Sequence, residues 1–299
     1  MEAWIPITIA AAAFQTLRFM AQKQLASGTL SATGATLARF LYAAPVVAVL
    51  IAMYAAVQGY AFPQLSLAFW LYAGIGGLGQ ILATVCVVAL FAHRNFAVWI
   101  TFKKTEVMLT ALAGFLVLGD RVTPFGALAI GIGFLGVLWL SDRPDGGGGR
   151  LRFFNKAAGL GVLSGVFFAV SAVGYRGAVL QIAGTDTVFQ AGLTLAIVTA
   201  GQSIAMSTWL AWRDPGQVTA VLRSWKTSGF VGLLSMAGSF CWFAAFSLQN
   251  AAYVFAVGQI ELIFSILAAT LWFKEKITAR EGWGMAILTL SITVLVVAG

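Results

Sequence analysis

Two stretches of the chain, residues 104–123 (KTEVMLTALAGFLVLGDRVT) and 259–278 (QIELIFSILAATLWFKEKIT), align without a gap after a shift of 155 positions. Each carries a glutamate near its start, Glu106 or Glu261, and ends in an acidic, a basic and an aliphatic residue followed by threonine. The match extends upstream, because positions 74–123 share about 13 identical pairs with their shifted counterparts. A long internal repeat in an apolar chain is typical of transporters built from two structural repeats.

The composition makes the lipid bilayer the expected solvent of this protein. The 299 residues are 60% hydrophobic and 9% charged, whereas roughly 25% of the residues of an ordinary soluble domain are charged. The mean hydropathy of +0.92 is correspondingly high. Most of the net charge of +8 lies in short polar connections. Membrane topology therefore explains the charge better than nucleic-acid binding, and no nucleic-acid partner is expected.

Ten segments are long and apolar enough to be predicted as membrane-spanning helices, since a crossing takes about 20 residues. Turn signals rich in glycine, proline, asparagine and aspartate separate most of them. The predicted helices are approximately 4–25, 33–57, 66–92, 96–118, 122–141, 156–180, 186–211, 227–249, 252–273 and 279–298.

The longest polar interruption, residues 142–155, contains four consecutive glycines and is predicted to be a flexible linker. It divides the chain into a first five-helix repeat, residues 1–141, and a second one, residues 156–299. After five crossings the chain re-enters from the opposite face, so the second repeat runs upside down relative to the first. The predicted fold is an all-α membrane protein in which two inverted five-helix repeats surround a central cavity.

The basic residues predict the orientation, because cytoplasmic loops of membrane proteins are enriched in lysine and arginine. About twelve basic residues follow the first, third, fifth, seventh and ninth predicted helices, whereas the opposite face carries Arg121 and Arg176. This bias places the chain in a cytoplasmic (inner) membrane with both termini on the non-cytoplasmic side. One chain already contains both repeats, so a monomer suffices.

The predicted helix 96–118 carries the densest set of polar side chains. Trp99, Lys103, Glu106 and Thr110 recur at helical spacing and share one face, and Lys104 adds a second cation. An aromatic ring, a cation, a carboxylate and a hydroxyl on one stripe suit a hydrated cavity that binds a small zwitterion. Alternatively, Lys103 and Glu106 form an i, i+3 ion pair that only stabilises the helix.

The equivalent helix 252–273 presents Gln259 and Glu261 at the positions of Lys104 and Glu106. Glu261 has no cation three or four residues away in its own helix. It is therefore either protonated by desolvation or paired with a cation from another helix, such as Arg18. In the first case Glu261, like Glu106, is a candidate for coupling transport to a proton.

Two arginines lie inside the first two predicted helices. Arg18 shares a helical face with Gln15 and is expected either to bind a substrate carboxylate or to extend toward the lipid headgroups. Arg39, close to Tyr42, is a candidate for the same carboxylate contact, but snorkelling or structural pairing is its favoured interpretation. Weaker candidates for the cavity, which packing or capping explains equally well, are Gln80, Tyr175, Arg176, Gln190, Trp242 and Asn250.

The sequence lacks the common motifs of catalytic and nucleotide-binding sites. It contains no phosphate-binding GxxxxGK[ST] loop, no nucleophile elbow and no HExxH zinc motif. The two cysteines, Cys86 and Cys241, lie among apolar residues and are interpreted as buried small side chains. Neither enzymatic activity nor a cofactor or metal site is expected.

The elements around the two glutamates resemble a signature of the drug/metabolite transporter superfamily, in its ten-helix EamA-type branch. The similar motifs are residues 104–106, 118–123 and Gly126, repeated at residues 259–261, 273–278 and Gly282. The resemblance implies a secondary transporter whose cavity lies between inverted repeats. It also implies export of amino acids, including aromatic ones, or of other small metabolites. Members of this branch often have cytoplasmic termini, whereas the basic residues here predict the opposite.

We therefore expect an exporter of amino acids or related metabolites that works by alternating access, with the lipid bilayer, a small-molecule substrate and a coupling proton as partners. A multidrug or sugar-type exporter of the same fold is the alternative. A membrane-embedded enzyme and a non-transporting scaffold lack supporting motifs. The predicted cavity residues are Gln15, Arg18, Tyr42, Trp99, Lys103, Lys104, Glu106, Tyr175, Gln259 and Glu261.

Overall fold

A computed structural model describes residues 2–26, 28, 30–90, 105–141, 156–273 and 279–298, and all regular secondary structure in these residues is helical. The helices before the predicted linker are α1 (Trp4–Ala26), α2 (Ala32–Leu41), α3 (Ala43–Gln58), α4 (Leu67–Leu90), α6 (Glu106–Leu118) and α7 (Pro124–Ser141). Those after it are α8 (Lys156–Val179), α9 (Thr187–Arg213), α10 (Pro215–Arg223), α11 (Trp225–Leu248), α12 (Ala251–Gly258), α13 (Ile260–Phe273) and α14 (Ala279–Ala298). The prediction of an all-helical protein is confirmed.

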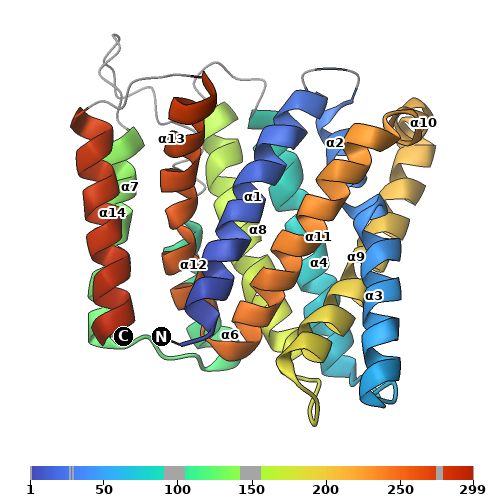
Figure 1. Cartoon of the computed structure of the whole chain (residues 1–299), viewed down its shortest axis with the longest axis horizontal. Helices are drawn as coiled ribbons and strands as arrows, with labels where there is room; N and C mark the ends of the chain where they lie inside the picture. Colours follow the sequence, from blue (N-terminus) through green and yellow to red (C-terminus); the bar gives the residue numbers. More distant parts are fainter. Residues whose placement is uncertain are drawn as a thin grey trace.

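Most helices lie side by side in one bundle with roughly parallel axes, and both chain ends lie at the same end of that bundle (Figure 1). The most extensive packing joins helices from opposite sides of the predicted linker: α4 packs against α8, α1 against α11, and α7 against α14. The main hydrophobic core accordingly contains side chains from both parts of the chain. The two halves therefore interlock and do not form separate domains with separate cores.

Six of the described helical segments are long and apolar enough to cross a membrane. They are Trp4–Ala26, Ala32–Gln58, Leu67–Leu90, Gly159–Val179, Thr187–Arg213 and Trp225–Leu248. Shorter apolar helices cover Glu106–Leu118, Pro124–Gly136, Ala251–Leu267 and Gly282–Val297. These ten segments correspond in order to the ten predicted ones, although the described part of four of them is too short to span a bilayer by itself.

The outer surface of the bundle is apolar and part of its interior is polar, the reverse of a soluble protein. Large hydrophobic side chains such as Val57, Trp212 and Leu67 are 84%, 82% and 75% exposed. In contrast, Arg18 and Arg39 are buried. This distribution suits a protein whose outside faces lipid and whose buried ionisable groups face one another or a cavity.

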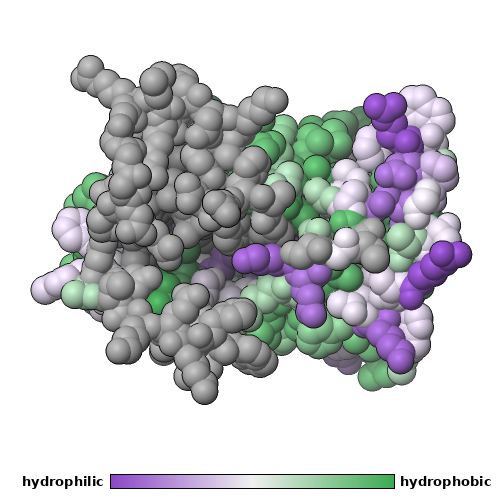
Figure 2. Space-filling view, turned by 90° about the horizontal axis from the view of Figure 1, so that it is seen from above, coloured by the Kyte–Doolittle hydropathy of each residue, from purple (hydrophilic) through white to green (hydrophobic). Residues whose placement is uncertain are grey.

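Two local features differ from the sequence-based expectation. Tyr42 separates α2 from α3 where one continuous helix is predicted, because Pro45 has no N–H to donate to the carbonyl of Leu41. The connection between the predicted helices 186–211 and 227–249 contains α10, with Pro215 at its first position, where proline is pre-organised for a helix. Hydrophilic side chains gather on the α10 side of the molecule in the end-on view (Figure 2).

Glycines allow α4 and α8 to approach closely. A Cβ atom on Gly174 would lie 2.7 Å from the Cα atom of Gly76 and 2.8 Å from the carbonyl oxygen of Tyr72. Both neighbours are backbone atoms, which cannot rotate away. Small residues are the usual means by which membrane helices pack at short distance.

We expect Gly174→Ala to separate α4 from α8 and to lower the free energy of unfolding by about 1–3 kcal/mol, as overpacking of a core does. Thermal unfolding in detergent micelles measures the effect. Gly159→Ala in the same helix is the matched control, because a Cβ there meets no atom within 4 Å. The control should be neutral or stabilising, since alanine is the better helix former. An unfolding temperature as high for Gly174→Ala as for Gly159→Ala would contradict the close packing.

At the start of α9, Asp186 caps the helix and joins it to two tyrosines. Its carboxylate accepts hydrogen bonds from the N–H of Phe189, at 2.9 Å, and from the hydroxyls of Tyr54, at 2.8 Å, and Tyr60, at 2.9 Å. Partial burial raises the pKa of Asp186, but the hydrogen bonds together lower that pKa below its ordinary value. The hydrogen bond with Asp186 raises the pKa of Tyr60.

A carboxyl group with a lowered pKa stabilises the fold above its unfolded-state pKa of about 3.9 and loses this contribution as the pH falls through the folded value. We therefore expect wild type to unfold at a higher temperature than Asp186→Asn at pH 6. The difference should shrink as the pH falls below about 4. A difference that is constant from pH 6 to pH 3 would show that the charge of Asp186 contributes nothing.

Candidate functional site

A small cavity lies inside the bundle where helices from both halves meet. Its volume is about 10 Å³, the space of about one water molecule, and it is lined by Gln15, Glu106, Phe168, Trp242, Phe255, Gly258 and Glu261. These residues come from α1, α6, α8, α11, α12 and α13. The structure thus brings together two carboxylates, an amide and three aromatic rings, and three of the predicted site residues, Gln15, Glu106 and Glu261, line the cavity.

Gln15 connects the polar and the aromatic walls of this cavity. Its Nε2 atom donates a hydrogen bond to Oε2 of Glu261 at 3.1 Å, and its Oε1 atom accepts one from Nε1 of Trp242 at 3.2 Å. Because the indole N–H only donates and an ionised carboxylate only accepts, the two contacts define the orientation of the amide. Gln15 is therefore held in place and presents its side chain to the cavity.

Both glutamates stand in the first turn of a helix. Glu106 begins α6, and Glu261 is the second residue of α13. Each side chain is only 5% exposed. The positive end of a helix dipole favours a carboxylate in its first turn, which offsets part of the cost of burying the charge.

The helix predicted over residues 252–273 is not continuous, because Gln259 separates α12 from α13. The preceding Gly258 explains the tight packing at this break: a Cβ on it would lie 2.4 Å from Cη2 of Trp242. The break creates the helix start at which Glu261 lies. Interrupted helices of this kind line the binding sites of many secondary transporters.

Aromatic rings form the apolar wall of the cavity. The indole of Trp242 packs edge-on against Phe255, with ring centroids 5.4 Å apart, and stacks with Phe246 at 6.0 Å. Phe168 from α8 completes the lining. Such a wall binds apolar or aromatic parts of a small molecule, whereas the carboxylates bind its cationic part.

Arg18 and Arg39 lie close to this cavity inside the bundle. Arg18 donates to Oε1 of Gln22, and its charge interacts with both Arg39 and Glu261. Arg39 donates to Oγ1 of Thr84 at 2.9 Å and to Oγ of Ser239 at 3.3 Å. Since the side chain of Arg39 is 3% exposed, the interpretation that it snorkels to the headgroups is wrong.

Other predicted site residues lie away from the cavity. The hydroxyl of Tyr42 donates to the carbonyl of Val221 in α10. Tyr175 donates to Oε1 of Gln80 at 2.8 Å and packs inside the core. The side-chain oxygen of Gln259 points toward α7, where a Cβ on Gly133 would lie 3.4 Å from it. Three further predicted residues, Trp99, Lys103 and Lys104, lie outside the described residues.

Sequence reasoning ranked Trp242 as a weaker candidate and missed Phe168, Phe255 and Gly258 entirely. Phenylalanine is frequent in this chain, so neither ring carries a signal of its own. Gly258, directly before Gln259 and Glu261, was the available clue, because a glycine in a predicted helix marks a break or a close approach.

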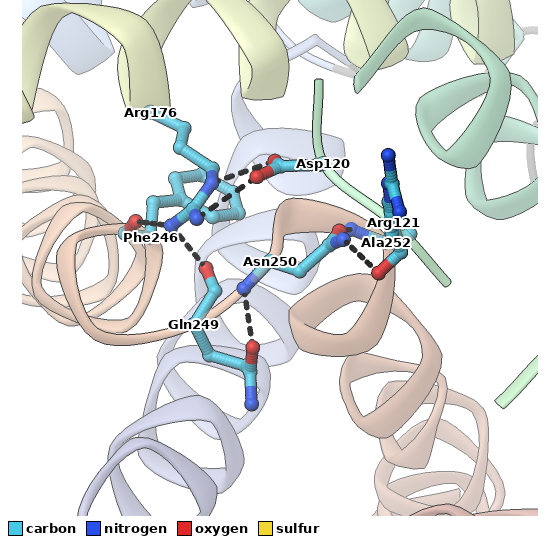
Figure 3. Close-up of polar contacts among 7 residues, drawn as sticks. All are labelled: Asp120, Arg121, Arg176, Phe246, Gln249, Asn250 and Ala252. Atoms are coloured by element: carbon cyan, nitrogen blue, oxygen red, sulfur yellow. Dashed lines mark hydrogen bonds and ion pairs between the residues drawn. The ribbon is translucent and has the colours of Figure 1, made fainter. Parts of the chain in front are cut away.

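A polar clamp closes the bundle at the end where the termini lie; we define it as Asp120, Arg176, the carbonyls of Phe246 and Gln249, and Asn250 (Figure 3). Arg176 in α8 binds Asp120 through two N–H groups, at 2.7 and 3.0 Å. Its third donor, Nη1, reaches the carbonyls of Phe246, at 2.7 Å, and Gln249, at 2.8 Å. One guanidinium therefore ties the α6–α7 connection to the end of α11.

Asn250 and Tyr253 extend the polar clamp. The Asn250 side chain accepts from the N–H of Ala252 at 2.9 Å, which caps α12, and donates to the carbonyl of Arg121 at 3.4 Å. The hydroxyl of Tyr253 accepts from the N–H of Thr123 at 2.8 Å. The loop between α6 and α7 is thus held by the start of α12.

Comparison with known proteins identifies the family. Residues 155–297 match the EamA-like transporter family. The second half of the chain is therefore similar to the EamA-like transporter family. This family is part of the drug/metabolite transporter superfamily, so the resemblance found in the sequence is confirmed at that level. EamA-like proteins are transporters and not typically enzymes, and the family together with the apolar helices makes the chain a multi-pass membrane protein.

The fold has known counterparts. Twenty-eight chains of solved structures match it. One, described only as "Crystal structure of protein", is 15% identical, has a TM-score of 0.62, and aligns over 97% of this chain and 99% of its own length. At this identity the likeness concerns the fold alone. No curated protein matches the chain. The EamA-like assignment therefore stands on the family match and indicates transport of small metabolites.

We expect Asp120→Asn to weaken the polar clamp by removing the charge that faces Arg176. Both side chains are nearly buried, at 13% and 14% exposure. The loss in unfolding free energy should therefore be about 1–2 kcal/mol, between the values for exposed and for buried pairs. Thermal unfolding in detergent measures it.

The control is Asp214→Asn, which removes a carboxylate from the exposed end of α9. Its effect should stay within about 0.5 kcal/mol. Equal unfolding temperatures for Asp120→Asn and Asp214→Asn would show that the Asp120–Arg176 pair stabilises nothing.

Proposed function

We propose that this protein is a secondary active transporter that exports amino acids, including aromatic ones, or related small metabolites across the cytoplasmic membrane by alternating access. One observation carries the proposal: two buried glutamates, Glu106 and Glu261, face one cavity together with Trp242 and Phe255. Ionisable side chains inside a membrane protein usually mark a substrate or ion pathway, because burying them without such a role is costly.

The cavity chemistry suits an amino acid. Glu106 and Glu261 bind the ammonium group, and the aromatic wall receives an apolar or aromatic side chain. The cavity volume of about 10 Å³ is far smaller than that of a typical ligand pocket, which spans about 300–1,000 Å³. In our proposal this conformation is therefore occluded, and the helices around the cavity separate to admit the substrate.

Several features support two inverted repeats, residues 1–141 and 156–299, joined by the linker 142–155. The segment of α2 and α3, Ala32–Gln58, and the helix α9, Thr187–Arg213, have the same length and differ by the same shift of 155 positions. The described helices before and after the linker also follow in corresponding order. In Figure 1, α1 runs upward from the end that carries the termini, whereas its counterpart α8 runs downward.

Alternating access requires each end of the bundle to open in turn. The polar clamp closes the end that carries the termini, and opening at that end requires Arg176 to leave Asp120 and the carbonyls of α11. In our proposal that end faces away from the cytoplasm, because few basic residues lie there. Protons are the proposed coupling ions, bound by Glu106 or Glu261 when the substrate leaves. One chain is a complete transporter.

The test is transport of labelled amino acids by purified protein in proteoliposomes. Glu106→Gln and Glu261→Gln keep the side-chain volume but remove the charge that meets the ammonium group. Each should reduce transport at least about tenfold, because a charge-assisted hydrogen bond is worth about 1.5–3 kcal/mol. Asp214→Asn, which removes a surface carboxylate, should transport like wild type. If both glutamine variants transport as fast as this control, the proposed role of the carboxylates is wrong.

A further inference from the structure

Arg18 and Arg39 face each other across two antiparallel helices. Nε2 of Gln22 in α1 donates to the carbonyl of Ala35 in α2 at 3.0 Å, which sets the two helices in register. Arg18 lies four residues before Gln22 and Arg39 four residues after Ala35. Because α1 and α2 are antiparallel, both steps lead about one helical turn deeper into the bundle. The two guanidinium groups therefore lie at the same depth, and their charges repel each other.

These two cations have only neutral partners among the described residues. Arg18 donates to an amide oxygen, and Arg39 donates to the hydroxyls of Thr84 and Ser239. Neither has a carboxylate within ion-pair distance in the described part of the chain. Nη2 of Arg18 and Nε of Arg39 are buried and have no acceptor there. The side chains are only 2% and 3% exposed, so water at the surface does not solvate them.

The pair adjoins the cavity. Arg18 is three residues from Gln15 in α1, and Ser239, which binds Arg39, is three residues from Trp242 in α11. Since Gln15 and Trp242 are hydrogen-bonded to each other, the two arginines lie about one turn beyond them along the bundle. The two hydroxyls on Arg39 belong to Thr84 and Ser239, which are equivalent positions of the internal repeat. Arg39 is therefore placed centrally between the two halves.

We propose that Arg18 and Arg39 together bind the carboxylate of the transported molecule. A guanidinium presents several N–H donors in one plane that match the two oxygens of a carboxylate. The rings of Phe19 and Phe40, 4.1 and 4.9 Å from the two guanidinium carbons, support this arrangement. The site then selects organic acids and amino acids and rejects amines that lack a carboxylate.

This inference rests on the proposed function, because both assume that the substrate binds in the same cavity. Binding measurements test the carboxylate site, and transport measurements test the proposed function. The probes share an indole ring: tryptophan and indole-3-acetate carry a carboxylate, whereas tryptamine and tryptophanamide do not. Binding is measured as the concentration at which each probe raises the unfolding temperature of the purified chain. Tryptophan and indole-3-acetate should bind at least tenfold more tightly than tryptamine and tryptophanamide. Equal binding of acids and amines, or no binding of the acids, overturns the inference.

Variants of Arg39 test whether this residue causes the preference for acids. Arg39→Gln should abolish the preference for acids over amines, and Arg39→Lys should retain part of it because the charge remains. Arg213→Gln, at the exposed end of α9, is the matched control and should retain all of it. If Arg39 has a purely structural role, Arg39→Gln should weaken the binding of all four probes equally. The ratio of acid to amine affinities would then stay unchanged, and the inference would be wrong.

Transport of the same probes into proteoliposomes tests the proposed function separately. Selective binding of the acids without any transport would overturn the proposed transporter while the carboxylate site stands. Transport of tryptophan and tryptamine at equal rates would support the transporter and overturn the carboxylate site. If Arg39→Gln does not fold, the wild-type ratio and Arg39→Lys decide the question.

Discussion

The cost of placing charge inside an apolar bundle organises this protein. Arg18, Arg39, Glu106 and Glu261 are all buried, although a charged side chain in mid-membrane costs several kcal/mol. Two positive and two negative groups offset one another in total, yet Arg18 and Arg39 form no direct ion pair with a carboxylate in the described residues. In the proposed function, a molecule that carries both signs binds between these groups.

The backbone adapts to these charges. The interruption at Gln259 creates a helix start at which Glu261 meets the positive end of the α13 dipole. Gly258 is needed there because Trp242 packs directly against it, and Trp242 in turn orients Gln15 toward Glu261. One small residue therefore determines the position of an aromatic wall, an amide and a carboxylate.

The sequence predicted the helices well, because hydropathy is a property of the chain alone, and the internal repeat singled out the two glutamates that line the cavity. Its errors lie where tertiary contacts decide. Tyr42 belongs to a long apolar segment, but its hydroxyl points to α10, a helix that the sequence did not predict between the segments 186–211 and 227–249. Arg39 was expected either to snorkel to the headgroups or to pair structurally, since nothing in its own helix revealed that Thr84 and Ser239 would meet it inside the bundle. Phe168 and Phe255 could not be distinguished from the other phenylalanines without knowing which helices meet.

The internal repeat reproduces the carboxylates but not the groups around them. Glu106 corresponds to Glu261, whereas the positions equivalent to Arg18 and Arg39 are Val173 and Thr194. Both described cations of the site therefore come from the first half of the chain. A binding site with exact twofold symmetry would accept a zwitterion in two opposite orientations. In the proposed binding mode, the carboxylates are duplicated and the described cations are not, so only one orientation places the carboxylate of a zwitterion on the arginines and its ammonium group on the glutamates. In this proposal, the divergence of the internal sequence repeat gives the site a defined polarity.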